Sequence, residues 1–200
     1  MKKRSFFVLF LALLAAGSLA LLAALQMEQQ SLSGKLIRLH VVANSDTESD
    51  QALKLQVRDA VLAVTQPLLS GADDPEQALS QALPEIQAAA EKCLDGAYPV
   101  RVSFGRERFP TRVYDSFSLP AGVYRSLRVT IGDGAGHNWW CVVFPSICFR
   151  ATADDLEAAA AAGGFTEDEV SLITESGEGY RLKFKAIELL QALKDRLFAE

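Results

Sequence analysis

The sequence has few histidines and cysteines, the side chains that most often bind zinc and other transition metals. Its 200 residues include only two histidines and three cysteines. His40 and His137 lie far apart, and the Cys-x-x-Cys and His-x-x-x-His spacings typical of zinc sites do not occur. The glycine cluster at 132–136 precedes a predicted strand, so it lacks the helix N-terminus of a phosphate-binding loop. The sequence therefore predicts neither a metal nor another cofactor.

Basic residues are fewer than acidic ones, 20 against 25. The formal net charge is −5, and the first twenty residues hold three basic groups and no acidic one, so the remainder carries −8. Such an acidic surface argues against a nucleic acid as the partner. With 50% hydrophobic and 22% charged residues, the composition is that of an ordinary globular protein.

Charged residues are absent from a long stretch near the N-terminus. The apolar run Phe6–Leu25 follows three basic residues and is interrupted only at positions 17 and 18. A basic segment before an apolar run is typical of an export signal. A run of about 20 apolar residues is also long enough to cross a bilayer. We therefore predict that residues 1–25 are a signal peptide, cut near Ala20, or a membrane anchor, and that residues 26–34 are a polar linker.

The rest of the chain alternates between the periods of strands and helices. We expect strands near residues 36–44, 99–104, 123–131 and 139–144, and helices that start near Ser45 and Asp74. The glycines at 132–136 predict a tight turn that joins the last two strands as a hairpin. Pro84 should kink or split the second helix.

This pattern predicts an α+β domain at residues 35–150. Its antiparallel sheet should have about four to five strands, with helices packed on one face. A helical tail should follow at residues 151–200.

Cys141 is the residue that most suggests a nucleophile. An exported cysteine hydrolase would use it with His40 or His137 as the base. However, Cys141 lies in the middle of an apolar strand, and burial there disfavours the reactive thiolate.

Cys141 and Cys148 can instead form a buried pair or a disulfide. Seven extended residues span about 23 Å, whereas bridged Cα atoms lie within about 7 Å. The chain would therefore have to turn back at Pro145 and Ser146. We predict this bridge in an exported chain, with Cys93 as the free thiol.

Polar side chains interrupt the first predicted strand. Arg38, His40 and Asn44 share one face, and Arg58 lies on a flank of the helix that follows. These residues form either a solvated strand face or a patch that binds a partner. On either interpretation we expect them to be exposed.

Two adjacent tryptophans, Trp139 and Trp140, point to opposite faces of the last predicted strand. One should join the core. The other, together with Tyr124 and Arg128 on the neighbouring strand, is suited to anchor a partner. A module that binds the cell wall would use the same aromatic rings.

Two sequence blocks carry a resemblance to a known family. The first reads Ile-Arg-Leu-His-Val-Val-Ala-Asn-Ser-Asp at 37–46. The second includes Leu-Pro-Ala-Gly-Val-Tyr at 119–124 and Gly-His-Asn-Trp-Trp-Cys-Val-Val-Phe-Pro at 136–145. With Phe-Pro-Thr-Arg at 109–112 between them, the stretch 36–149 resembles stage II sporulation protein R of endospore-forming bacteria.

The resemblance implies an intercellular signal and not an enzyme. Members of the family are made in the forespore and exported into the space between the two membranes of the dividing sporangium. There they activate a membrane-embedded aspartic protease of the mother cell, which processes pro-sigma factor E to its active form. This protease is the expected partner, together with the membrane if the N-terminal segment is retained. The alternatives are a cysteine-dependent cell-wall hydrolase and a wall-binding module.

Overall fold

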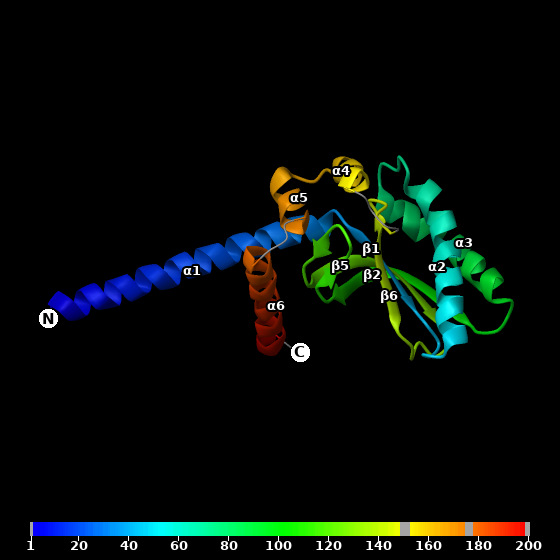
Figure 1. Cartoon of the computed structure of the whole chain (residues 1–200), viewed down its shortest axis with the longest axis horizontal. Helices are drawn as coiled ribbons and strands as arrows, with labels where there is room; N and C mark the ends of the chain where they lie inside the picture. The colour runs from blue at the N-terminus through cyan, green and yellow to red at the C-terminus, as the bar shows by residue number, and fades with distance from the viewer. Residues whose placement is uncertain (1, 149–152, 175–177, 199–200) are drawn as a thin grey trace. The chain divides into compact units, whose positions relative to one another are not determined.

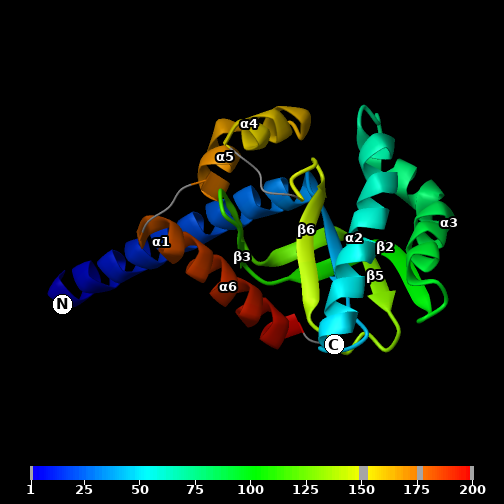
Figure 2. The same cartoon turned by 45° about the vertical axis from the view of Figure 1, so that its right-hand side comes forward.

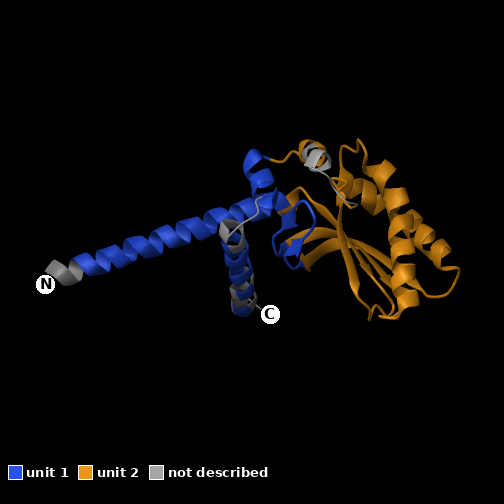
Figure 3. Cartoon of the chain, viewed as in Figure 1, with its two compact units in different colours: residues 1–32, 109–122, 166–200 blue, residues 33–108, 123–165 orange. Residues whose placement is uncertain are grey.

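The computed structural model describes residues 2–148, 153–174 and 178–198. The chain divides into two compact units, shown in Figure 3. Unit 1 comprises residues 1–32, 109–122 and 166–200, and unit 2 comprises residues 33–108 and 123–165. Unit 2 contains a four-stranded sheet and the helices that cover it, which confirms the α+β class.

One long helix forms the N-terminal segment. In α1 (Lys2–Gly34) the stretch Phe6–Gly34 is long and apolar enough to cross a membrane, and its most apolar window of 18 residues has a mean hydropathy of 2.6. A signal sequence meets the same criteria, so the segment is compatible with either a signal or an anchor. Residues 26–34, expected as a linker, continue this helix. Leu25, Gln29 and Leu32 recur there at helical spacing and are buried.

The sheet of unit 2 has the strand order β2-β5-β1-β6 (Figure 1). Its strands are β1 (Ile37–Val42), β2 (Val100–Phe109), β5 (Gly122–Ile131) and β6 (Asn138–Phe144). β1 runs parallel to β5 and antiparallel to β6. The expected antiparallel sheet was therefore wrong, because the sheet is mixed.

The last two strands do not form the predicted hairpin, because β1 lies between them. The loop 132–137 instead passes over the end of β1, where Ala135 donates a backbone hydrogen bond to the carbonyl of Asn44 at 3.1 Å. A Cβ atom at Gly136 would collide with the carbonyl oxygen of Ser45. The glycines therefore permit a close crossing of two chain segments.

Two helices, α2 (Glu48–Leu69) and α3 (Pro75–Leu94), pack side by side on one face of the sheet (Figures 1 and 2). α2 begins after Thr47, whose side chain accepts a hydrogen bond from the backbone of Asp50. α3 passes through Pro84 without being split. The core between helices and sheet includes Val57, Val61, Leu79, Ile86, Leu39, Val41, Leu127, Val129 and Val143.

The predicted tail is helical in the part that the structure describes. α4 (Ala153–Ala162) belongs to unit 2. α5 (Glu167–Thr174) and α6 (Glu178–Phe198) belong to unit 1, with the paired strands β3 (Arg112–Val113) and β4 (Ser118–Leu119). Residues 151–152, 175–177 and 199–200 of the expected tail lie outside the described residues.

Candidate functional site

The sheet face opposite α2 and α3 carries a network of polar and aromatic side chains from four strands. We call it the sheet-face network. Its members are Arg38, His40, Glu107, Tyr124, Ser126, Arg128, Asn138 and Trp140.

His40 lies at the centre of this network and is only 3% exposed. Its Nδ1 atom lies 2.8 Å from Oε1 of Glu107, and its Nε2 atom lies 2.9 Å from Oδ1 of Asn138. The ring of Trp140 stacks on the imidazole. Strand register accounts for this arrangement, because His40 is paired with Trp140 on β6 and with Arg128 on β5.

Glu107 connects β2 to the two neighbouring strands. Its carboxylate accepts hydrogen bonds from Ser126 Oγ and from Arg128 Nη1, each at 2.8 Å. Burial raises the pKa of Glu107, but hydrogen bonds with His40 and Ser126 and the charges of His40 and Arg128 lower it more. The pKa of Glu107 therefore lies below its usual value. Sequence analysis missed this residue because it ended the strand at Phe104, whereas β2 continues to Phe109.

Arg38 is fully buried, with 0% of its surface exposed. Its Nε donates to the carbonyl of Cys141 at 3.2 Å, and its guanidinium carbon lies 5.1 Å from the ring centroid of Tyr124. The expectation that Arg38 and His40 are exposed was therefore wrong. Strand periodicity shows which residues share a face, but it does not show whether that face is covered.

Arg58 and Trp139 meet on the other face of the sheet. The guanidinium carbon of Arg58 lies 4.3 Å from the ring centroid of Trp139, and its Nε donates to Asp59 at 2.7 Å. Trp139 packs against the core. Arg58 therefore does not join Arg38 and His40 in one patch. Of the two tryptophans, Trp139 is the core residue and Trp140 belongs to the sheet-face network.

Asn44 stands at the junction between β1 and α2. Its Oδ1 accepts from the backbone N–H of Asp133 at 3.0 Å, and its Nδ2 donates to Oδ2 of Asp50 at 2.9 Å. Ser45 Oγ donates to the same carboxylate oxygen at 2.6 Å. Hydrogen bonds from Ser45 and Asn44 lower the pKa of Asp50. Asn44 therefore ties the loop after β5 to the start of α2.

Asp46 and His137 form an exposed pair beside this junction. The backbone N–H of His137 donates to Asp46 Oδ1 at 2.6 Å, and the imidazole Nδ1 lies 2.5 Å from the same oxygen. The hydrogen bond from the His137 side chain is the largest cause of the lowered pKa of Asp46. Lys54, which is 5% exposed, donates to the His137 carbonyl at 3.0 Å, and burial lowers its pKa. The sequence did not reveal this contact of Lys54, because the residue lies on the flank of a helix and its acceptor is a backbone carbonyl of a distant loop.

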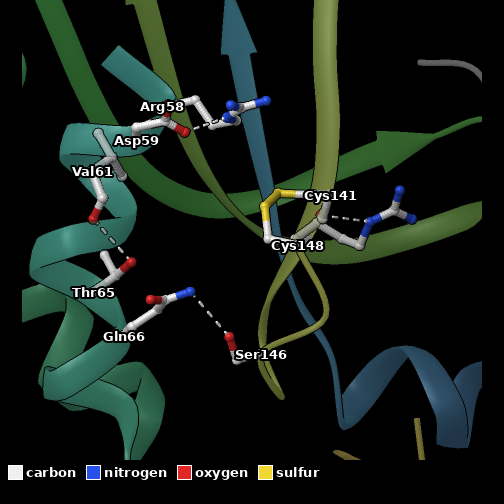
Figure 4. Close-up of a disulfide and its surroundings, with 9 residues drawn as sticks. Arg58, Asp59, Val61, Thr65, Gln66, Cys141, Ser146 and Cys148 are labelled. Atoms are coloured by element: carbon white, nitrogen blue, oxygen red, sulfur yellow. Dashed lines mark hydrogen bonds and ion pairs between the residues drawn. A yellow bond between two sulfur atoms is a disulfide. The ribbon is translucent and has the colours of Figure 1, made fainter. Parts of the chain in front are cut away.

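Cys141 and Cys148 form a disulfide with Cα atoms 4.9 Å apart, and Cys93 is a free thiol. This is the pairing predicted from the sequence. Figure 4 shows the bridge beside α2, where Gln66 Nε2 donates to Ser146 Oγ at 3.4 Å.

The disulfide bears directly on the hydrolase interpretation. The sulfur of Cys141 is bonded to Cys148, so it has no thiolate for a histidine to activate. Cys141 pairs with Leu39 of the core, whereas His40 points to the opposite face of the sheet. Within the described ranges, no three His, Cys, Asp or Glu side chains lie close enough to bind one metal ion.

The fold and the site together define a class of protein. It is an α+β domain that follows an N-terminal apolar helix, and its polar side chains join the strands and loops to one another. Comparison with known proteins identifies the family. The chain belongs to the stage II sporulation protein R family, whose model matches residues 33–154.

The chain is 35% identical over 161 residues to stage II sporulation protein R of Bacillus subtilis (strain 168). This match covers 74% of the chain and 72% of the relative. No solved structure matches the chain. Family membership confirms the resemblance seen in the sequence and makes the chain a sporulation signalling protein.

Proposed function

We propose that this chain is an exported intercellular signal. It is made in the forespore, reaches the space between the two membranes of the sporangium, and activates a membrane-embedded aspartic protease of the mother cell. That protease then processes pro-sigma factor E. The observation that carries the proposal is the family match at residues 33–154, which follows the apolar run of α1 after a short, mostly polar segment.

The disulfide supports an oxidising location for the folded domain. Such bonds persist outside the cytoplasm and are rare within it. Cys141 is 1% exposed, so the bridge lies inside the domain as a structural element. A reactive role for Cys141 in a wall hydrolase has no support, because its sulfur is already bonded.

Activation by binding requires that the signal prefer the active arrangement of the protease. Among the residues predicted to bind, Arg128 keeps 44% of its side chain exposed and Trp140 is half-buried. Asn138, beside them, is exposed. We place the protease contact on this rim of the sheet-face network. Arg38, His40 and Tyr124 lie beneath it and hold its shape.

Reconstitution tests this function. Cells that contain the membrane protease and pro-sigma factor E, but no protein of this family, receive the full chain, and processing is scored by immunoblot. The wild-type chain should restore processing. Asn138→Ala should reduce it about tenfold, the loss typical of a contact residue that contributes about 1.4 kcal/mol.

Gln81→Ala on the exposed side of α3 is the matched control and should process normally. Absence of processing with a folded wild-type chain contradicts the proposed function. Full processing by Asn138→Ala and by Arg128→Ala contradicts only the proposed contact surface.

A further inference from the structure

We infer that helix α6 is an interfacial helix that lies on the surface of an anionic membrane. Leu182 and Leu189 enter the boundary of the acyl chains, and the basic residues of the helix meet the lipid headgroups. This inference rests on the proposed export of the chain and on the retention of α1 as a membrane anchor, one of the two interpretations of that segment given above.

Exposed apolar side chains are concentrated in unit 1. Outside α1, the described large apolar residues that are more than half exposed are Val113, Leu182 and Leu189, at 75%, 71% and 63%. All three belong to unit 1, which also contains α1. The exposed large apolar residues of unit 2, Leu55 and Val123, have only 37% and 41% of their surface exposed. A surface that exposes several apolar side chains marks a site of interaction.

The two leucines of α6 lie on one side of the helix. They are seven positions apart, which is close to two helical turns, so both side chains point the same way. Phe184 and Ile187 occupy the opposite side and are 4% and 2% exposed. Thr111 forms a side-chain hydrogen bond with Glu188. One side of α6 is therefore attached to the protein, and the leucine side is bare.

The start of α6 lies beside the segment of α1 that directly follows its apolar run, which is where a membrane-spanning α1 would emerge from the bilayer. The apolar run of α1 ends at Leu25, and the next six residues are polar except for Met27. Lys183 of α6 lines the same cavity as Met27 and Glu28 of α1, a space of about 540 Å³. If α1 spans a membrane, α6 therefore begins within about two helical turns of the boundary. Figures 1 and 2 show α6 leading away from the axis of α1.

The basic residues of α6 favour anionic lipid as the partner of the side that carries Leu182 and Leu189. Lys185 pairs with Glu188 at 3.1 Å and keeps 67% of its side chain exposed beside the leucines. Arg196, also exposed, continues the leucine row seven positions after Leu189, where its long side chain can reach a headgroup. An apolar stripe bordered by basic residues is typical of helices that lie in the membrane interface. A second copy of the chain fits less well, because the heptad through Leu182 and Leu189 reaches Arg196 next.

Cysteine accessibility tests the inference on the full chain. Cys93→Ser removes the free thiol, and Leu189→Cys then provides one reactive site on α6. The chain is inserted into vesicles of phosphatidylcholine alone or of phosphatidylcholine mixed with phosphatidylglycerol. A charged maleimide that cannot cross membranes should react with the introduced thiol several-fold more slowly in the anionic vesicles. Adding Lys185→Glu and Arg196→Glu should abolish this protection.

Gln81→Cys, in the same background, places the thiol on the exposed side of α3 and should react equally in both vesicles. Equal reaction rates at Leu189→Cys in both vesicles, with the chain still bound, overturn the role of α6 alone. A chain that does not float with either vesicle overturns the anchoring by α1 as well. Protection that persists in detergent without lipid, with cross-links between chains, assigns the surface to a second copy and also overturns the inference.

Discussion

Trp140 lies flat on His40, with ring centroids 3.8 Å apart and ring planes inclined by 15°. The indole covers one side of the imidazole while Glu107 and Asn138 hold its two nitrogens. The position of the His40 ring is therefore set by stacking on one side and by hydrogen bonds at both nitrogens, as expected of an interior residue. The imidazole of His40, on β1, therefore connects Glu107 of β2 with Asn138 of β6.

The sheet-face network should contribute to stability mainly through Glu107. Glu107→Ala leaves His40, Ser126 and Arg128 without their shared acceptor, and loss of the acceptor of buried donors costs about 1–3 kcal/mol. Urea unfolding measures the loss. Arg101→Ala, an exposed position on the same strand, is the control and should change stability by less than about 0.5 kcal/mol. Equal unfolding free energies of the two variants would show that the hydrogen bonds of Glu107 do not stabilise the fold.

The same carboxylate predicts a dependence of stability on pH. Folding lowers the pKa of Glu107 from its usual value of 4.5. The charged form therefore stabilises the fold above that value, and this contribution disappears as the pH falls through the lowered pKa. Wild type should lose unfolding free energy more steeply than Glu107→Gln below about pH 4.5. Unfolding midpoints measured at a series of pH values test this, since Asp46 and Asp50 are shared by both proteins.

Reduction of the disulfide should destabilise unit 2. The bridge closes a short loop, with a separation of 7 positions, and constraint of the unfolded chain over such a loop contributes about 2–3 kcal/mol. The double variant Cys141→Ser, Cys148→Ser should show this loss without reductant and should be insensitive to added reductant. Cys93→Ser should keep the sensitivity of wild type. Peptide mapping without reductant should recover Cys141 linked to Cys148, and recovery of both as free thiols contradicts the pairing.

The loop that crosses the end of β1 depends on the absence of a side chain at position 136. Gly136→Ala brings a methyl group against the Ser45 carbonyl, a backbone atom that cannot move alone. We expect a loss of about 2 kcal/mol, in the range for overpacking of a tight site. Gly105→Ala is the matched control, because nothing lies within 4 Å of a Cβ atom built there. Thermal unfolding compares them, and an equal change in both variants argues against the crossing.

Removal of residues 1–24 should leave unit 2 folded. The described residues from Phe6 to Leu21 are exposed, and Leu25 is the first buried apolar residue of α1. The shortened chain should therefore keep the far-ultraviolet circular dichroism and the unfolding temperature of the sheet domain. An unfolded product would show that the apolar segment takes part in the core.

Local sequence patterns predicted the elements of this fold better than their assembly. The spacing of Leu79, Ile86 and Leu94 marks α3, because a helix stripe depends only on near neighbours. The placement of β1 between β5 and β6 depends on pairings across the whole domain, and no period within a strand reveals it. The same limit explains the site. Arg38 and His40 were recognised as unusual, but their burial follows from what covers the strand.

The position of β1 also determines the order in which the sheet can form. Arg38 donates a hydrogen bond to the carbonyl of Cys141, which lies 103 positions later in the chain. The two strands beside β1 in the sheet, β5 and β6, also come late in the sequence. A chain that is synthesised from its N-terminus completes β1 long before β5 and β6. Contacts of such long range form slowly, because the loop must close before any pairing compensates for its entropy. Closure of the sheet is therefore a late step in folding, and a chain that stops before Asn138 leaves β1 without one of its two neighbours.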